Sequence, residues 1–120
     1  MDRTLTRLEK AILEQIAAAP QNRDLVIAEH LPFISVRSRD LTGVGMYVNF
    51  DDSSPPEVLS ERLSEKDVFA SNHIVEIDTL KNGLGFALYA KDGKLDFLEL
   101  FTYGMELWDG SYNSISFSEV

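Results

Sequence analysis

The hydrophobic residues among the first 20 positions recur with the spacing of an amphipathic helix. Every third or fourth residue is apolar, which places these side chains on one face of a helix. The stripe consists of Leu5, Leu8, Ile12, Leu13 and Ile16. Thr4 stands before it and suits an N-cap, whose side-chain oxygen accepts a hydrogen bond from a free backbone N–H. Pro20 stands after it and stops a helix. The pattern predicts a helix over residues 4–19.

The following stretch has a less regular pattern. Residues 24–30 (DLVIAEH) fit a short helix capped by Asn22 or Asp24, and they fit a strand equally well. In either case Pro32 ends the segment. Farther along, Pro55-Pro56 indicates a loop, because two adjacent prolines cannot pair in a sheet. Residues 57–66 then predict one or two turns of helix.

From residue 33 the apolar positions alternate, as they do in a half-buried strand. In residues 34–39 the alternation sets Ile34, Val36 and Ser38 against Ser35, Arg37 and Arg39. Residues 44–50 continue it after a turn at Thr42-Gly43, with Val44, Met46, Val48 and Phe50 on one face. These two segments predict a β-hairpin.

A second hairpin has the strongest local signal. The segments 84–90 and 95–103 flank Lys91-Asp92-Gly93-Lys94, and Asp-Gly between two strand-like runs is typical of a tight hairpin turn. A two-residue turn and a three-residue turn with a bulge at Gly93 both fit, so the register stays open. Residues 73–80 and 114–117 predict further strands.

Together these elements predict an α+β fold with an N-terminal amphipathic helix packed on a mostly antiparallel sheet of about five strands. The chain has 120 residues and fits a single domain, 1–120. It has no cysteine, which suits a reducing compartment. The charged N-terminus does not resemble a secretory signal, and no apolar run is long enough to span a membrane. We therefore expect a cytoplasmic protein without a membrane partner.

The net charge of −9 is confined to the later part of the chain. Residues 1–40 carry six basic and six acidic side chains, whereas residues 41–120 carry five basic and 14 acidic ones. Such a region repels phosphate backbones, so we expect no nucleic-acid partner. It would attract a basic protein, although a solvated surface kept soluble by like charge explains the same composition.

Familiar catalytic and cofactor patterns are missing. The two histidines, His30 and His73, lie in different segments, and a lone histidine is more often structural than catalytic. The acidic stretch Asp51-Asp52-Ser53-Ser54 lacks the glycine and the distal glutamate of a calcium loop. Gly83-x-Gly85 leads into a strand, whereas a dinucleotide fingerprint leads into a helix. We expect neither a metal nor a cofactor.

Glu99 is the one residue whose position asks for a chemical explanation. Alternation within its strand puts Leu95, Phe97, Glu99 and Phe101 on one face, where an unpaired carboxylate would be costly. Three interpretations stay open. Glu99 forms a structural ion pair with Arg37 or Arg39, or it lies on a face open to solvent or a partner. In the third, it is an acid or base in an aromatic pocket lined by Phe97, Phe101 and Tyr103.

Two blocks of the sequence resemble a family of small, uncharacterised bacterial proteins. The first block runs from Arg39 to Tyr47 and reads RDLTGVGMY. The second begins with NGLGF at residue 82 and continues through DGKL at residue 92 to LE at 98 and FTYG at 101. The resemblance covers about a third of the chain and implies a shared fold. It implies no activity, because the family has no established function.

The sequence thus supports two functions of different classes. The first is a non-enzymatic protein-binding module, such as an immunity-type protein that masks a basic toxin or nuclease. It rests on the acidic sheet region and on the lack of a catalytic set. The alternative is a small-molecule-binding or hydrolytic domain centred on Glu99, which is also the only candidate for a catalytic residue. A homodimer joined through an exposed sheet edge is a third arrangement.

Overall fold

The computed structural model describes residues 3–20, 22, 27–55, 67–69 and 73–119. In chain order, the elements are α1 (Arg7–Ala18), α2 (Ile27–His30), a 3₁₀ turn (Leu31–Phe33), β1 (Ile34–Leu41), β2 (Gly45–Asp52), β3 (Asp67–Phe69), β4 (His73–Ile77), β5 (Leu84–Lys91), β6 (Lys94–Thr102) and β7 (Ile115–Glu119). The predicted helical turns at residues 57–66 lie outside the described residues.

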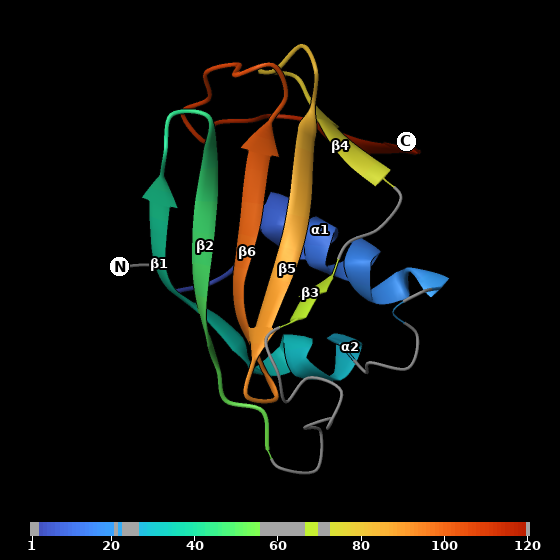
Figure 1. The fold of residues 1–120 in the computed structure, drawn as a ribbon, viewed down its shortest axis with the longest axis vertical. Helices are drawn as coiled ribbons and strands as arrows, with labels where there is room; N and C mark the ends of the chain where they lie inside the picture. Colours follow the sequence, from blue (N-terminus) through green and yellow to red (C-terminus); the bar gives the residue numbers. More distant parts are fainter. Residues whose placement is uncertain (1–2, 21, 23–26, 56–66, 70–72, 120) are drawn as a thin grey trace.

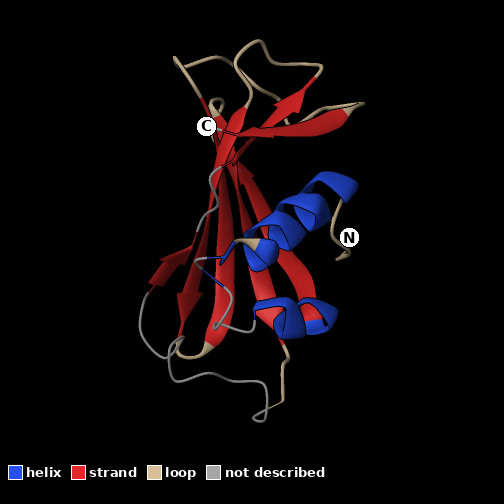
Figure 2. Ribbon diagram, turned by 90° about the vertical axis from the view of Figure 1, so that its right-hand side faces the viewer, coloured by secondary structure: helices blue, strands red, loops and turns tan. Residues whose placement is uncertain are grey.

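The strands form one antiparallel sheet. Within the described residues, six strands follow the order β1-β2-β6-β5-β4-β7, and the short β3 pairs with β5. Figure 1 shows the four long strands β1, β2, β6 and β5 side by side, and Figure 2 shows both described helices on one side of them. The predicted α+β class with an antiparallel sheet is confirmed. The sheet has more strands than the five or so expected, and the short β3 is the strand that the sequence pattern did not predict.

Helix α1 begins two residues later than Thr4 would imply. Thr6 is the N-cap: its hydroxyl accepts a hydrogen bond from Glu9 N, while the Glu9 carboxylate accepts one from Thr6 N. This reciprocal capping box satisfies two backbone donors at once, so the prediction of Thr4 as the cap is wrong. At the other end, Pro20 follows the C-cap Ala19 as expected. Of residues 24–30, the described part is the single turn α2, so it is helical.

The β5–β6 hairpin has the two-residue turn. Lys91 pairs with Lys94, and both turn residues have positive φ, 55° at Asp92 and 80° at Gly93, as a type I′ turn requires. A bulge follows at Asp96, which is left without a partner between the pairs Ala90–Leu95 and Tyr89–Phe97. An extra residue reverses the side-chain alternation. The prediction that Leu95 shares a face with Glu99 is therefore wrong.

A second bulge changes the alternation in β1. Val36 pairs with Phe50 and Arg39 pairs with Val48, so Arg37 is the extra residue between the two registers. The predicted grouping of Ser38 with Val36 is therefore wrong, because the alternation reverses at the bulge. The side chain of Arg39 consequently points to the same side as the buried Val36 and Val48, toward the helices.

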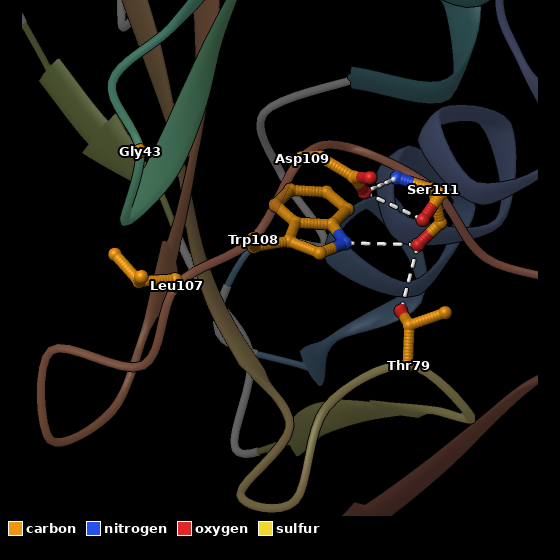
Figure 3. A pocket seen from close by; sticks show the side chains of 6 residues that line it. All are labelled: Gly43, Thr79, Leu107, Trp108, Asp109 and Ser111. Atoms are coloured by element: carbon orange, nitrogen blue, oxygen red, sulfur yellow. Dashed lines mark hydrogen bonds between the residues drawn. The ribbon is translucent and has the colours of Figure 1, made fainter.

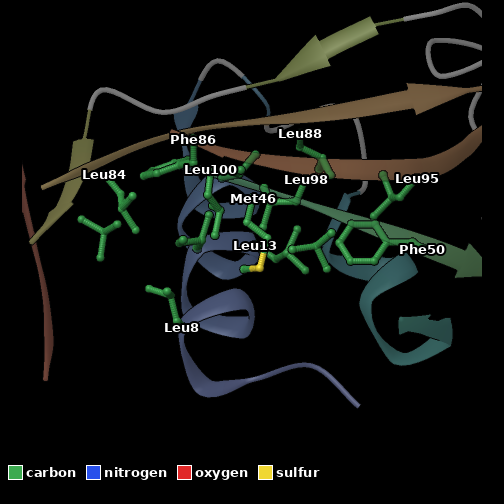
Figure 4. Packing of buried hydrophobic residues seen from close by; sticks show 14 of the residues in the cluster. Leu8, Leu13, Met46, Phe50, Leu84, Phe86, Leu88, Leu95, Leu98 and Leu100 are labelled. Carbon is green, nitrogen blue, oxygen red and sulfur yellow. The ribbon is translucent and has the colours of Figure 1, made fainter. Parts of the chain in front are cut away.

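The core lies between α1 and the sheet. Leu8, Ile12, Leu13 and Ile16 from α1 belong to one buried cluster with strand residues. In Figure 4 the side chains of the strands, among them Leu98 and Leu100, lie on the side of the sheet toward α1. Both are almost fully buried, and such burial of apolar area is the main stabilising contribution to a fold. In the part of the chain that the structure describes, no helix is long and apolar enough to cross a membrane.

Candidate functional site

Glu99 lies in the middle of the sheet face that is turned away from the helices. Its neighbours along β6, Leu98 and Leu100, are buried in the core, so Glu99 points to the opposite side. There it lies between Tyr47 on β2 and Ala87 on β5, its paired residues across the sheet. Both described helices lie behind this face (Figure 2). The carboxylate is therefore half-buried among strand residues and open toward solvent.

Two tyrosine hydroxyls donate hydrogen bonds to the Glu99 carboxylate. Tyr89 Oη lies 3.1 Å from Oε1, and Tyr47 Oη lies 3.4 Å from Oε2. Burial raises the pKa of the Tyr89 phenol, and the hydrogen bond to the Glu99 carboxylate and its negative charge raise it further. Tyr89 therefore stays protonated and acts as a donor, which suits a positioning role and not a base.

Aromatic rings surround the carboxylate. Phe97 stacks on Tyr89 with ring centroids 4.3 Å apart and meets Tyr47 edge-on at 5.8 Å. On the other side of Glu99, Phe101 packs edge-on against Tyr103 at 5.8 Å. Two of these rings are among the more exposed apolar side chains, Tyr47 at 37% and Tyr103 at 39%. We call this surface the aromatic face, and it consists of Tyr47, Tyr89, Phe97, Glu99, Phe101 and Tyr103.

Gly85 lies beneath two side chains of the aromatic face, Phe101 and Tyr103. A Cβ at Gly85 would lie 2.2 Å from the Phe101 ring and 2.6 Å from Tyr103 Oη. The two aromatic side chains therefore lie directly over the Gly85 backbone, in a space that any larger residue would fill.

The structure brings four of the predicted site residues together and separates the other two. Glu99, Phe97, Phe101 and Tyr103 share the aromatic face. Arg37 and Arg39 lie elsewhere, bonded to other residues. Tyr47 and Tyr89 complete the site, and the sequence did not identify them as partners of Glu99. Alternation along their own strands turns both side chains away from the buried residues. Only the strand order, however, places them beside Glu99.

Neither arginine is paired with Glu99. Arg39 points to the helix side and forms two hydrogen bonds of 2.8 Å with the buried carboxylate of Glu9. Arg37 bonds to the carbonyl of Phe50 at 2.9 Å and reaches Asp51 at 3.4 Å. Of the three interpretations of Glu99, the geometry matches the carboxylate on an open face.

Four of the hollows lined by described residues have volumes from about 250 to 530 Å³, and Glu99 lines none of these four. The 530 Å³ hollow lies beside Trp108 and is drawn in Figure 3. Its polar groups bond to one another: Trp108 Nε1 and Thr79 Oγ1 both donate to the carbonyl of Ser111. The described polar side chains of this hollow therefore bond to groups in its own wall.

A buried polar cluster of His30, Asp52 and Ser54 was not predicted. His30 Nδ1 lies 2.7 Å from Asp52 Oδ2 and 3.0 Å from Ser54 Oγ, and His30 is fully buried. Its other ring nitrogen, Nε2, has no hydrogen-bond partner among the described residues. In a hydrolytic triad the serine and the carboxylate contact opposite ring nitrogens. Here both contact Nδ1, so the arrangement is structural. Alternation alone gave no signal for it, because His30 comes from a different segment than Asp52 and Ser54.

Among the described residues, no group of three or more histidine, aspartate or glutamate side chains could hold a metal ion. No family model, no curated protein and no solved structure matches this chain. The family resemblance drawn from the two sequence blocks therefore stays a prediction, and the functional argument rests on the aromatic face.

Proposed function

We propose that this protein is a non-enzymatic binding module that holds a basic protein partner on its aromatic face. The observation that carries the proposal is the position of Glu99, which has no basic partner among the described residues and lies among aromatic rings on the open side of the sheet. An immunity-type protein that masks a basic toxin or nuclease would work in this way. The lack of cysteine suits such a role in the cytoplasm.

The composition of the face supports this proposal. Tyrosine and phenylalanine are enriched in the centres of protein–protein interfaces, where large rings give contact area at low entropic cost. Asp40 adds a second carboxylate, since it pairs with Tyr47 from β1 and therefore shares its face. The acidic excess of residues 41–120 is negative, like the charges of Glu99 and Asp40. It would speed the approach of a basic partner.

The shape of the face favours a macromolecule over a small substrate. Small-molecule sites are usually concave and enclose most of the ligand, whereas Glu99 lines none of the four hollows of about 250 to 530 Å³ that described residues line. A hydrolytic site also needs a second group to activate water or to bind the developing charge. Among the described residues, the groups that donate hydrogen bonds to Glu99 are the phenols of Tyr47 and Tyr89, and the pKa of Tyr89 is raised. The hydrolytic alternative therefore has less support.

The test is a comparative pull-down at low salt, with the captured proteins identified by mass spectrometry. The bait is the wild-type chain, the double variant Tyr47→Ala/Glu99→Gln, or the control Glu76→Gln. Glu76 is exposed on β4, outside the aromatic face, so the control removes one charge elsewhere. We expect a basic protein that wild type and control retain and the double variant loses, with less retained as salt rises.

Retention of the same proteins by all three baits would contradict the proposal. Light scattering on the purified chain measures its oligomeric state and so tests for a homodimer. If the chain is a homodimer that Tyr47→Ala/Glu99→Gln dissociates, the aromatic face binds a second copy of the chain, and the proposal of a basic partner fails.

A further inference from the structure

We infer that the aromatic face receives one arginine side chain of the partner, whose guanidinium forms two hydrogen bonds with Glu99 between Tyr47 and Tyr89. This inference rests on the proposed function and makes it more specific. It names the chemical group that the centre of the interface recognises.

The first argument is the number of acceptor positions that Glu99 still offers. An ionised carboxylate has about four lone-pair positions, two on each oxygen. Tyr89 occupies one on Oε1 and Tyr47 occupies one on Oε2. One position is left on each oxygen, and a guanidinium donates two parallel N–H bonds with matching spacing. The tyrosines also fix the plane of the carboxylate, so the free positions are held in place for a two-pronged donor.

The second argument is that the described part of the chain supplies no such donor itself. The described ion pairs join Arg3 and Arg37 to Asp51 and Arg39 to Glu9, and His30 contacts Asp52. None of them includes Glu99. Within the described residues, only neutral hydroxyls are bonded to this half-buried carboxylate, which therefore gains most from a cation supplied by a partner.

The third argument concerns the kind of cation. The rings of Tyr47 and Phe97 meet edge-on at 5.8 Å beside Glu99, and Phe101 flanks it along β6. A guanidinium is flat, stacks on aromatic rings and is more weakly hydrated than an ammonium group. It therefore loses less hydration in an aromatic surrounding. A lysine would place one point charge on the carboxylate and leave part of this geometry unused.

The test uses two peptides of equal charge, hexa-arginine and hexa-lysine, as probes. Each is titrated into the ¹⁵N-labelled chain at low salt, and the amide shifts of β2, β5 and β6 report where it binds. The variants are Glu99→Gln, the matched control Glu76→Gln and the ring variant Tyr47→Ser. Glu99→Gln should fold, because it removes a charge from an aromatic surrounding on an open face.

For wild type and Glu76→Gln we expect tighter binding of hexa-arginine than of hexa-lysine, with shifts centred on Glu99. Glu99→Gln should weaken hexa-arginine binding by about 10- to 100-fold, the usual effect of hydrogen bonds to a charged group, and abolish the preference. Tyr47→Ser should weaken hexa-arginine binding more than hexa-lysine binding. It also tests the inference independently if Glu99→Gln does not fold.

The results that overturn the inference differ from those that overturn the proposed function. Equal binding of both peptides, lost together in Glu99→Gln, would show an acidic binding face without a preference for guanidinium. In that case the proposed function stands and the inference fails. Shifts centred away from β2, β5 and β6, with equal effects of Glu99→Gln and Glu76→Gln, also overturn the inference, and the pull-down then decides the proposed function alone.

Discussion

Asp52 accepts a hydrogen bond of 2.7 Å from His30 Nδ1, and both side chains are buried. The same Asp52 oxygen accepts a second bond, of 2.9 Å, from the backbone N–H of Leu95. Its other oxygen accepts a bond from Ser54 N at 3.0 Å. One carboxylate thus joins α2, the end of β2 and the start of β6.

This contact accounts for the irregular start of β6. The last paired residues of β2 and β6 are Asn49 and Phe97, so the N–H of Leu95 has no partner on β2. Asp52 supplies that acceptor through its side chain, which lets the bulge at Asp96 form without leaving a buried donor unsatisfied. The cluster is a structural device at the lower end of the sheet, separate from the aromatic face.

We predict that Asp52→Asn lowers the free energy of unfolding by about 3 kcal/mol, because it leaves buried hydrogen-bond donors without an acceptor. An asparagine side chain has one acceptor oxygen in place of two, so it cannot accept hydrogen bonds from His30, Ser54 and Leu95 as the carboxylate does. Urea unfolding followed by circular dichroism measures the loss. The matched control is Asp51→Asn, since Asp51 is half-exposed and pairs with Arg3 and Arg37. An exposed pair contributes less than about 1 kcal/mol, so similar losses in both variants would contradict this interpretation.

Acid should destabilise the protein partly through Asp52. Burial raises its pKa, but the hydrogen bonds from His30, Ser54 and Leu95 outweigh burial and hold the pKa below its ordinary value of 3.8. A carboxyl whose pKa is lower in the folded state stabilises that state above the unfolded pKa and loses this effect as pH falls. We therefore expect unfolding free energies from urea titrations to decrease below about pH 4.

Asp52→Asn should make this decrease shallower. Asp78 supplies a second contribution of the same sign, because the N–H groups of Ser114 and Asn113 hold the pKa of its carboxyl well below the ordinary range. The double variant Asp52→Asn/Asp78→Asn should therefore be less sensitive to acid than either single variant. An unchanged slope in Asp52→Asn would show that the carboxyl of Asp52 has the same pKa in the folded and unfolded chains.

The sequence predicted the elements that a repeating pattern controls. The apolar stripe from Leu5 to Ile16 defined α1, and Asp92-Gly93 defined the tight turn of the second hairpin. Both signals are local, because helix period and turn chemistry depend on neighbouring residues.

The parts that the sequence did not predict depend on distant contacts. The bulges at Arg37 and Asp96 each reversed an alternation that was read correctly up to that point. The separation of Glu99 from Leu95, which lies on the covered face, follows from the bulge at Asp96. The chemistry at Glu99 was singled out from its residue type, but its partners Tyr47 and Tyr89 come from two other strands. No local pattern shows which strands become neighbours.

The ion pair between Glu9 and Arg39 offers a test of how α1 is held against β1. Arg39→Met should lower the free energy of unfolding by about 3 kcal/mol, because it leaves the buried Glu9 carboxylate without its cation. The double variant Glu9→Met/Arg39→Met leaves no buried charge unpaired, so its free energy of unfolding should fall by less. Part of that smaller loss, about 1 kcal/mol, comes from the missing capping bond to Thr6. Both values come from urea unfolding. A double variant that loses as much as the sum of both single variants would show that the two side chains act independently.

Gly85 is the residue whose substitution should reveal how rigid the aromatic face is. An alanine Cβ would overlap the Phe101 ring, 2.2 Å away, and force Phe101 and Tyr103 outward. We expect Gly85→Ala to lower the free energy of unfolding by about 1–3 kcal/mol, as overpacking usually does. It should also change the ring-proton shifts of Tyr103.

Phe101→Leu provides the relief variant, since it removes the part of the ring that the new methyl group meets. Gly85→Ala/Phe101→Leu should therefore be more stable than the sum of the two single losses implies. If the double variant shows strict additivity, the Phe101 ring does not rest on the Gly85 backbone in solution. The aromatic face would then adapt to its partner, and binding would have to supply the order that the structure shows at Glu99.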